Sequence, residues 1–138
     1  MYPEEIVKPC RAQLTENGFD SLESSADVES YMNDNKGETI LMVVNSVCGC
    51  AAGSARPGVL KSLQNDKIPS KLATVFAGVD REATQTAREF MLPYPGSSPS
   101  IAIFKNGQLV HFIERHMIEG RSADMIAEHL KACYAQFC

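Results

Sequence analysis

The sequence contains no apolar run that approaches the roughly 20 residues needed to cross a bilayer as a helix. Its first residues, 1–5, are acidic and lack the basic and apolar regions of a secretory signal peptide. These two absences predict a protein that is neither membrane-embedded nor exported. A cytoplasmic location is therefore expected, where cysteine thiols are mostly kept reduced.

A surplus of positive charge is also missing. The 13 Lys and Arg residues are outnumbered by 17 Asp and Glu residues, so the formal net charge is -4. A general nucleic-acid binder needs clustered basic residues, and that class of protein is excluded. No internal repeat, low-complexity tract or interdomain linker interrupts the sequence, of which 44% is hydrophobic. One domain covering residues 1–138 is predicted, with enough apolar residues for a core.

Cysteine is present but does not form the pattern of a secreted protein. The five cysteines are Cys10, Cys48, Cys50, Cys133 and Cys138. An odd number at irregular spacing does not fit a disulfide framework, which leaves catalysis, metal binding and burial. Cys10 and Cys133 lie on apolar stripes of predicted helices and are assigned to the core. Cys138, the last residue, is expected to be flexible and inert.

Predicted strands and helices alternate along the chain, which indicates an α/β fold. The run 39–45 is continuous, apolar and rich in branched residues, as in a central strand that is covered on both faces. Further strands are predicted at residues 72–79, 100–105 and 108–113, the last two joined by the Asn106-Gly107 turn. Helices are predicted at residues 3–17 with a kink or restart at Pro9, between Ser24 and Gly37, at 51–64, at 82–91 and after Ser122. Pro57 is expected to bend the helix 51–64 or to separate its first turns from the rest.

The connections predict how the strands pair. A right-handed crossover places the first two strands in parallel, and the hairpin adds two antiparallel strands. The expected architecture is a mixed four-stranded sheet in the order 2-1-3-4, with helices on both faces and an N-terminal helical extension.

Two cysteines separated by one glycine stand where the strand 39–45 ends and a helix begins. Backbone donors and the dipole at the start of a helix lower the pKa of a thiol. Residues two apart on a helix point to nearly opposite sides, so Cys48 must lie outside the regular helix to bond with Cys50. Gly49 allows the tight turn, and the small ring is expected to be strained and readily reduced. This favours a transient catalytic disulfide with Cys48 as the nucleophile.

The charges around this pair favour a thiolate. No Asp or Glu occurs from residue 39 to residue 65, whereas Arg56 and Lys61 lie within that stretch. A nearby cation stabilises the charged form of a thiol. Arg56 and Gly49 are therefore assigned supporting roles beside the catalytic pair.

The chain resembles a known family. Cysteines after the first core strand resemble the redox motif of the thioredoxin fold, and Ser98-Pro99-Ser100 resembles its cis-proline segment, although that motif usually has two residues between its cysteines. Within this superfamily the chain closely resembles the bacilliredoxins over most of its length. The resemblance is carried by residues 44–51, 55–57, 74–78, 97–100, 115–116 and 118–120.

The resemblance implies a cytosolic thiol–disulfide oxidoreductase that removes bacillithiol from S-thiolated client proteins, with no cofactor. It further implies a cis Ser98–Pro99 bond that faces the cysteines, with the client bound along the backbone beside it. Cys48 attacks the substrate disulfide, Cys50 resolves the mixed disulfide, and a low-molecular-weight thiol or a reductase restores the pair. A route with Cys48 alone, cleared by a second thiol molecule, stays open, as does homodimer formation.

Two other functions could use the same cysteines. A general protein-disulfide isomerase or reductase differs only in its substrates, and no residue pattern separates it from a bacilliredoxin. A metal site could combine the pair with Cys138, Cys133 or His116, but closed zinc sites usually space paired ligands more widely. No metal is therefore expected, and His116 and His129 are assigned to holding a loop and to packing.

Overall fold

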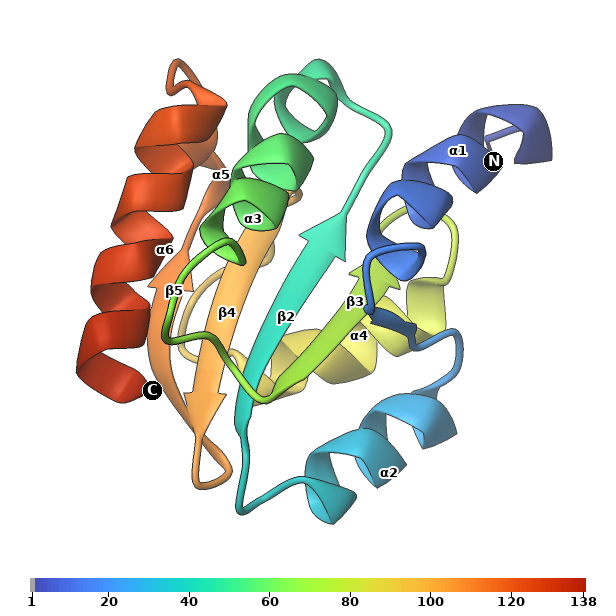
Figure 1. Cartoon of the computed structure of the whole chain (residues 1–138). Helices are drawn as coiled ribbons and strands as arrows, with labels where there is room; N and C mark the ends of the chain where they lie inside the picture. Colours follow the sequence, from blue (N-terminus) through green and yellow to red (C-terminus); the bar gives the residue numbers. More distant parts are fainter. Residues whose placement is uncertain (1) are drawn as a thin grey trace.

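The computed structural model describes residues 2–138 and contains one mixed β-sheet with helices on both faces (Figure 1). The strands are β1 (Asp20–Ser21), β2 (Thr39–Asn45), β3 (Lys71–Phe76), β4 (Ser100–Lys105) and β5 (Gln108–Ile113). Their order across the sheet is β1-β3-β2-β4-β5. β2 pairs with β3 in parallel and with β4 antiparallel, and β4 pairs antiparallel with β5.

The four predicted strands and their order are confirmed, but the sheet has a fifth strand. β1 pairs in parallel with the outer edge of β3, where Asp20 lies opposite Ala73 and Ser21 opposite Thr74. A strand of two residues has no alternation of apolar and polar positions, so periodicity cannot predict it. The expectation of four strands was wrong for this reason.

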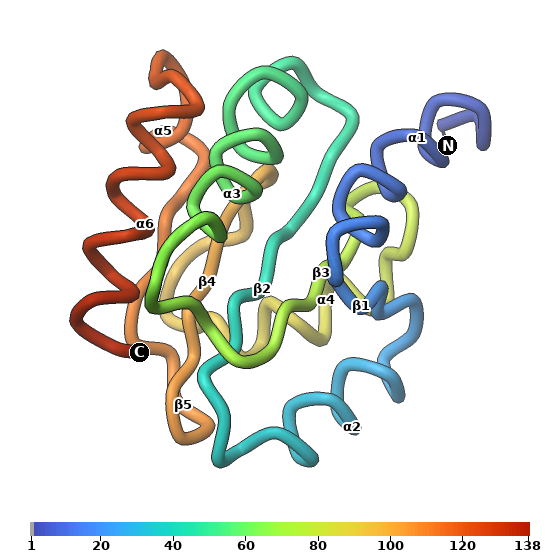
Figure 2. The backbone as a smooth tube through the Cα atoms, in the orientation of Figure 1, coloured from blue at the N-terminus to red at the C-terminus, as the bar shows by residue number. Residues whose placement is uncertain are grey.

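The helices are α1 (Glu4–Thr15), α2 (Ser25–Asp34), the π-helical turn η1 (Ala51–Ala55), α3 (Arg56–Ser62), α4 (Arg81–Phe90), α5 (Arg115–Ile118) and α6 (Ala123–Phe137). In the tube view the two ends of the chain lie at opposite edges of the molecule, near α1 and at the end of α6 (Figure 2). Within residues 2–138, no helix is long and apolar enough to cross a membrane.

Two of the predicted helices contain a proline. α1 continues through Pro9 instead of restarting there. Pro9 has no N–H to donate to the carbonyl oxygen of Glu5, four residues earlier. Glu5 is exposed, so water can take the place of that donor. The first turns of the predicted helix 51–64 form η1 and are separate from α3, as Pro57 predicted. Pro57 lies in the first turn of α3, where a missing N–H is tolerated.

The sheet separates two hydrophobic clusters. Ile40, Met42 and Val44 of β2 contribute to the cluster beneath α2 and α4. Leu41 and Val43, which alternate with them, contribute to the cluster beneath α1, α3 and α6. Every residue of β2 from 40 to 45 is buried, as expected for a central strand covered on both faces. The end of β2 is therefore a rigid place from which to present a side chain.

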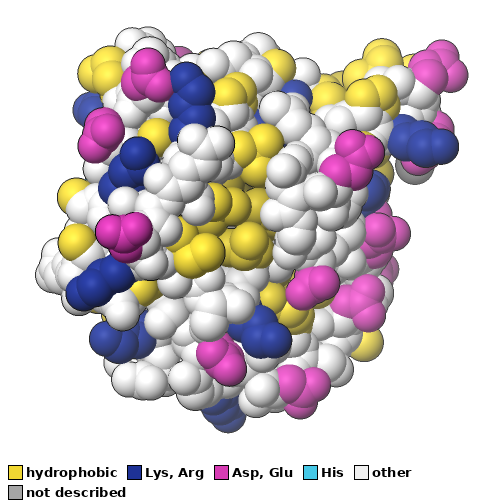
Figure 3. Space-filling view, in the orientation of Figure 1, with side chains coloured by type: hydrophobic (Ala, Val, Ile, Leu, Met, Phe, Trp, Pro, Cys, Tyr) yellow, Lys and Arg dark blue, Asp and Glu magenta, His cyan; other side chains and the backbone are white. Residues whose placement is uncertain are grey.

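The face that carries α1, α3 and α6 has a mixed surface. Hydrophobic side chains gather near its centre, while Lys, Arg, Asp and Glu side chains lie mostly around its edge (Figure 3). Positive and negative side chains are interspersed on this face, so it presents no broad patch of one sign.

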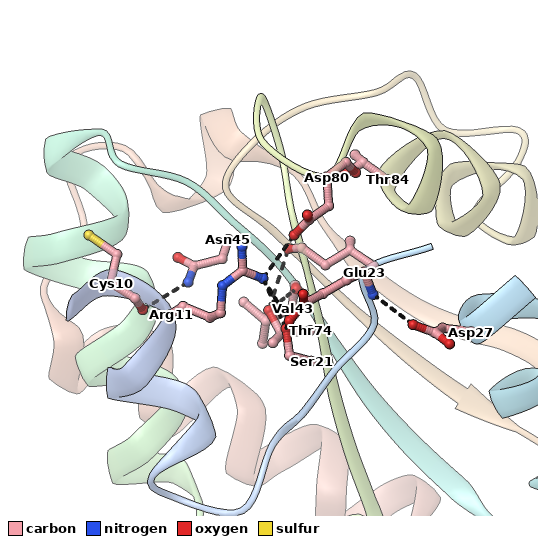
Figure 4. Close-up of polar contacts among 11 residues, drawn as sticks. Cys10, Arg11, Ser21, Glu23, Asp27, Val43, Asn45, Thr74, Asp80 and Thr84 are labelled. Atoms are coloured by element: carbon pink, nitrogen blue, oxygen red, sulfur yellow. Dashed lines mark hydrogen bonds and ion pairs between the residues drawn. The ribbon is translucent and has the colours of Figure 1, made fainter. Parts of the chain in front are cut away.

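Arg11 fastens α1 to the edge of the sheet (Figure 4). Its Nη1 atom lies 2.8 Å from Asp80 Oδ2, 3.0 Å from Ser21 Oγ and 3.4 Å from Glu23 Oε2. Its guanidinium group also lies over the ring of Phe76, 5.3 Å from the ring centre. The N-terminal extension is thus part of the packed structure and brings α1 beside the end of β2.

The contact between α3 and α6 depends on a glycine. A Cβ atom at Gly58 would lie 2.8 Å from the Ile126 side chain and 3.0 Å from the carbonyl oxygen of Ala123. We expect Gly58→Ala to lower the free energy of unfolding by about 1–3 kcal/mol, measured by urea denaturation, because the helices must move apart. Gly53→Ala is the matched control, since a Cβ there meets nothing within 4 Å. Equal stability of the two variants would contradict this packing.

Candidate active site

The segment after β2 places Cys48 at the start of a helical stretch. β2 ends and, after an irregular turn, the backbone becomes helical at Gly49. The Cys48 carbonyl oxygen accepts hydrogen bonds from the N–H groups of Ala51 and Ala52, at 3.1 and 3.2 Å. Cys48 therefore precedes the helix, whereas Cys50, with φ -63° and ψ -38°, lies within it. Cys48 therefore lies outside the regular helix, as the spacing of the two cysteines predicts.

A buried guanidinium group fixes this segment. Only 3% of Arg56 is exposed. Its Nη1 donates to Asn45 Oδ1 at 2.9 Å and to the Ser46 carbonyl oxygen at 2.7 Å, and its Nε donates to Gln13 Oε1 at 2.7 Å. Hydrogen bonds from a charged donor are stronger than neutral ones, especially in a buried site. Arg56 therefore holds the turn before Cys48 from inside the protein.

Asn45 connects the same turn to α1. Its side chain is almost fully buried, and its Oδ1 accepts a second hydrogen bond from the Ser46 N–H at 2.9 Å. Its Nδ2 donates to the carbonyl oxygen of Cys10 at 3.0 Å, as Figure 4 shows. A buried amide with partners on both of its polar atoms is held in one orientation. The position of the turn is thus set jointly by α1 and α3.

The Cys48 thiol is partly buried, yet its surroundings favour the thiolate. Burial by itself raises the pKa of this thiol. The Ser46 hydroxyl opposes that effect, because it donates a hydrogen bond to Cys48 Sγ at 3.1 Å. The backbone N–H groups of Ala51 and Cys50 and the positive charge of Arg115 act in the same direction. Together they outweigh burial and hold the pKa of Cys48 below its ordinary value.

Arg115 also binds the proline segment. Its Nη1 donates to the Ser98 carbonyl oxygen at 3.1 Å, and its Nε is paired with Glu119 Oε1 at 2.8 Å. The Ser98–Pro99 peptide bond is cis, as the family resemblance predicted. Arg115 therefore links the turn that precedes β4 with the electrostatic environment of the thiol.

A pocket of about 280 Å³ opens beside Cys48. Its lining comes from the N-terminal segment, the ends of β2 and β3, α4, the proline segment and α5. The lining residues are Tyr2, Ser46, Val47, Cys48, Ala77, Gly78, Arg88, Ser98 and Arg115. The volume is close to the lower end of the range for small-molecule pockets, about 300–1,000 Å³.

Arg88 supplies a second cation to this pocket. Its Nη2 donates a long hydrogen bond of 3.4 Å to the Ser97 carbonyl oxygen, and its buried Nε has no hydrogen-bond partner among residues 2–138. Burial lowers the pKa of this guanidinium group from its ordinary value. Within the described chain no carboxylate pairs with it, so the positive charge of Arg88 is not neutralised by an acidic side chain.

Comparison with known proteins agrees with this geometry. A family model described as "Disulphide isomerase" matches residues 2–138. A bacilliredoxin of Cytophaga hutchinsonii is 61% identical over 134 residues, covering 97% of this chain and 98% of the relative. The chain belongs to the bacilliredoxin family. Bacilliredoxins of Halalkalibacterium halodurans and Staphylococcus aureus are 49% and 50% identical, each over 99% of this chain and 94% and 95% of the relative.

Solved structures place this bacilliredoxin-family chain in the thioredoxin fold. A reduced Schistosoma mansoni thioredoxin pre-protein matches with a TM-score of 0.61 and 17% identity, over 88% of this chain and 99% of that chain. A Fasciola hepatica thioredoxin matches with a TM-score of 0.57 and 17% identity, over 84% and 99% of the two chains. The predicted fold class is confirmed.

Only some of the predicted site residues line the pocket beside Cys48. Cys48 and Ser98 line the same pocket, whereas Cys50 packs against the hydrophobic cluster beneath α3 and α6. Pro99 forms the cis bond next to Ser98, and Gly49 begins the helical stretch.

Arg56 is hydrogen-bonded to the turn that precedes Cys48, but its charge is not among the causes that lower the pKa of the Cys48 thiol. Its hydrogen bonds go to neutral acceptors, and the cation that lowers the pKa of Cys48 is Arg115. Sequence proximity pointed to Arg56, because α5 is brought to the site only by the tertiary fold. The resemblance included Arg115 within a matching segment, which was the one available signal for it.

The remaining cysteines lie elsewhere. Cys133 is buried as predicted, Cys10 is only partly buried, and Cys138 is exposed. His116 is exposed and lies 3.8 Å from Glu114. In the part of the chain that the structure describes, no third cysteine, histidine or carboxylate joins the Cys48–Cys50 pair in a metal-like cluster.

The hydrogen bond from Ser46 gives a test of the thiolate environment. Ser46→Ala removes a donor to the charged form, so the pKa of Cys48 is expected to rise. Alkylation of Cys48 at neutral pH is expected to slow about tenfold, which corresponds to a hydrogen bond to a charged group of about 1.5 kcal/mol. The measurement is the pH dependence of adduct formation on the Cys48 peptide, followed by mass spectrometry.

The control for this test is Ser54→Ala, because the Ser54 hydroxyl donates to the Arg121 carbonyl oxygen instead. Its alkylation profile is expected to match that of the wild type. A profile for Ser46→Ala that matches the wild type as well would contradict the assigned hydrogen bond.

Proposed function

We propose that this chain removes bacillithiol, or a similar small anionic thiol, from mixed disulfides on cytoplasmic proteins. The family and the fold support the coarser function of a thiol–disulfide oxidoreductase. One observation carries the finer proposal. Cys48, with its lowered pKa, opens into a pocket that also presents the guanidinium groups of Arg88 and Arg115.

Cys48 is the nucleophile in this proposal. Its thiolate attacks the small-thiol sulfur of the mixed disulfide, forming a new bond from Cys48 Sγ to that sulfur. The bond from the small thiol to the client sulfur breaks, and the client leaves as a thiolate that takes a proton from solvent. No net oxidation occurs in this step, because one disulfide replaces another.

Two routes then restore the enzyme. In the first, Cys50 attacks Cys48 Sγ, the small thiol leaves, and the resulting Cys48–Cys50 disulfide is reduced by two equivalents of thiol or by a reductase. In the second, a further small-thiol molecule attacks the small-thiol sulfur held on Cys48 and leaves with it as a symmetric disulfide. The inward packing of Cys50 supports different roles for the two cysteines, since only Cys48 lines the pocket.

The pocket suits a small anionic thiol better than a bulky or cationic one. It has room for a small molecule, and its two guanidinium groups are planar donors that match carboxylates. Within residues 2–138 no carboxylate pairs with Arg88, so the charge of this pocket-lining residue is available to an anion. We therefore expect the negatively charged groups of the bound small thiol to face α4 and α5.

The client is proposed to lie along the Ser98–Pro99 segment. Ser98 lines the pocket with Cys48, so a chain that passes it comes close to the reacting sulfur. The Ser98 carbonyl oxygen accepts from Arg115 in the structure, and a client that pairs with this backbone must share or displace that bond. Arg115 would then contact both the client backbone and the small thiol.

A general disulfide isomerase or reductase is the second candidate, favoured by the description of the matching family model. It would use the same cysteines on disulfides within or between proteins. The two candidates differ in whether a small thiol must occupy the pocket. Rates on protein disulfides and on small-thiol mixed disulfides of the same client separate them.

The function is tested by release of small thiols from one client protein that carries bacillithiol, glutathione or cysteamine. Wild type is expected to prefer the two anionic thiols over the cationic cysteamine. Cys48→Ser is expected to abolish release, while Cys50→Ser is expected to accumulate an adduct on Cys48 that is visible by mass spectrometry. Cys10→Ser, outside the pocket, is the control and is expected to retain wild-type turnover.

Two results would count against this function. Normal turnover by Cys48→Ser would remove the proposed nucleophile. Equal rates on all three mixed disulfides, with faster rearrangement of protein disulfides, would replace the bacillithiol proposal by the isomerase.

A further inference from the structure

A second group of reactive side chains lies between β5 and α6, separate from the pocket of Cys48. It consists of His111 on β5 and of His129 and Cys133 on α6, which runs along β5 at one side of the molecule (Figures 1 and 2). The Nε2 atoms of the two histidines are 2.9 Å apart. One donor atom from each of the three residues falls within 4.8 Å of the others.

Regular secondary structure brings the three side chains together. His111 precedes the buried Ile113 by two residues and pairs with Ile103, both in the cluster beneath α6, so it faces that helix. His129 and Cys133 are four residues apart and share one face of α6. The cluster is therefore held by rigid elements, which is favourable for a binding site.

We propose that His111 Nε2, His129 Nε2 and Cys133 Sγ bind one borderline-soft divalent transition-metal ion, of which Zn²⁺ is the representative. Imidazole nitrogen and thiolate sulfur are both zinc ligands, and three protein ligands leave a fourth position for water or another ligand. A pair of ligands four residues apart on a helix, completed by a third from a neighbouring element, supplies that set here.

The distances are close to those that such an ion requires. Zinc bonds of about 2.0–2.1 Å to nitrogen and about 2.3 Å to sulfur place tetrahedral donors roughly 3.3–3.6 Å apart. The two histidine nitrogens are slightly nearer than this, and the widest separation in the cluster needs to shorten by about 1 Å.

The protonation states are compatible with binding. Burial lowers the pKa of both His111 and His129, which favours the neutral imidazole that binds a metal. Burial raises the pKa of the Cys133 thiol. Binding therefore displaces the Cys133 proton to solvent as the metal–sulfur bond forms, and the oxidation state of the metal does not change.

The competing explanation is a plain hydrogen bond between two neutral histidines, in which one Nε2–H donates to the other Nε2. This hydrogen bond accounts for the short distance between the two histidines, but it does not involve Cys133. The two explanations predict different responses to added metal, because only a three-ligand site produces a metal–thiolate bond at this position.

The test is a titration of the reduced, metal-free protein with Co²⁺, which reports thiolate bonding by a charge-transfer band and tetrahedral geometry by its visible d–d bands. Wild type is expected to bind one equivalent with both features. His129→Gln is expected to weaken binding by at least about 100-fold, because losing even an outer-shell partner costs 10–100-fold. His116→Gln is the matched control and is expected to bind as wild type does.

Two further variants make the result decisive. His111→Gln is expected to behave as His129→Gln does, and circular dichroism of each variant without metal establishes that it is folded. The Cys48→Ser/Cys50→Ser protein is expected to keep the charge-transfer band, because neither cysteine belongs to the cluster. Absence of stoichiometric binding, a band unaffected by both histidine variants, or a band lost with Cys48 and Cys50 would overturn the proposal.

Discussion

The buried Arg56 guanidinium group is the interaction on which the active-site geometry depends. Within residues 2–138 no carboxylate lies at ion-pair distance from it, and three neutral oxygen acceptors solvate its charge. A buried charge is tolerated only when such partners are well placed, so the positions of Asn45 and Ser46 are tightly constrained. Ser46 carries this constraint to the thiol, because its carbonyl oxygen accepts from Arg56 and its hydroxyl donates to Cys48.

From that fixed turn the two cysteines acquire different environments. Cys48 precedes the helical stretch, receives hydrogen bonds and faces a pocket with two cations, whereas Cys50 is within the helix and packs inward. The Cys48 thiolate is therefore stabilised by hydrogen bonds from nearby residues and by the charge of Arg115, which lies far away in the sequence. Arg115 of the same segment donates to the Ser98 carbonyl oxygen, so one residue contacts the cis-proline turn and acts on the pKa of Cys48.

Much of the fold could be predicted from the sequence, because the features that determine it are local. The apolar run of β2 and the Asn106-Gly107 turn identify buried strand and hairpin directly. β1 was missed because two residues have no periodicity. The sequence points to Arg56 as a neighbour of Cys48, but the hydrogen bonds from Arg56 to Asn45 and Ser46 are visible only in the folded structure. Arg88, Arg115 and the pairing of His111 with His129 depend on tertiary contacts that residue spacing does not contain.

We propose that the buried Arg56 network, acting through Ser46, makes Cys48 a reactive thiolate. The most direct measurement is the alkylation rate of Cys48 at neutral pH in Arg56→Met, a side chain that is similarly long and carries no charge or donor. We expect a folded variant in which Cys48 is alkylated up to about tenfold more slowly, at a rate that approaches that of a cysteine in an unstructured peptide. A folded Arg56→Met protein with wild-type reactivity at Cys48 would contradict it.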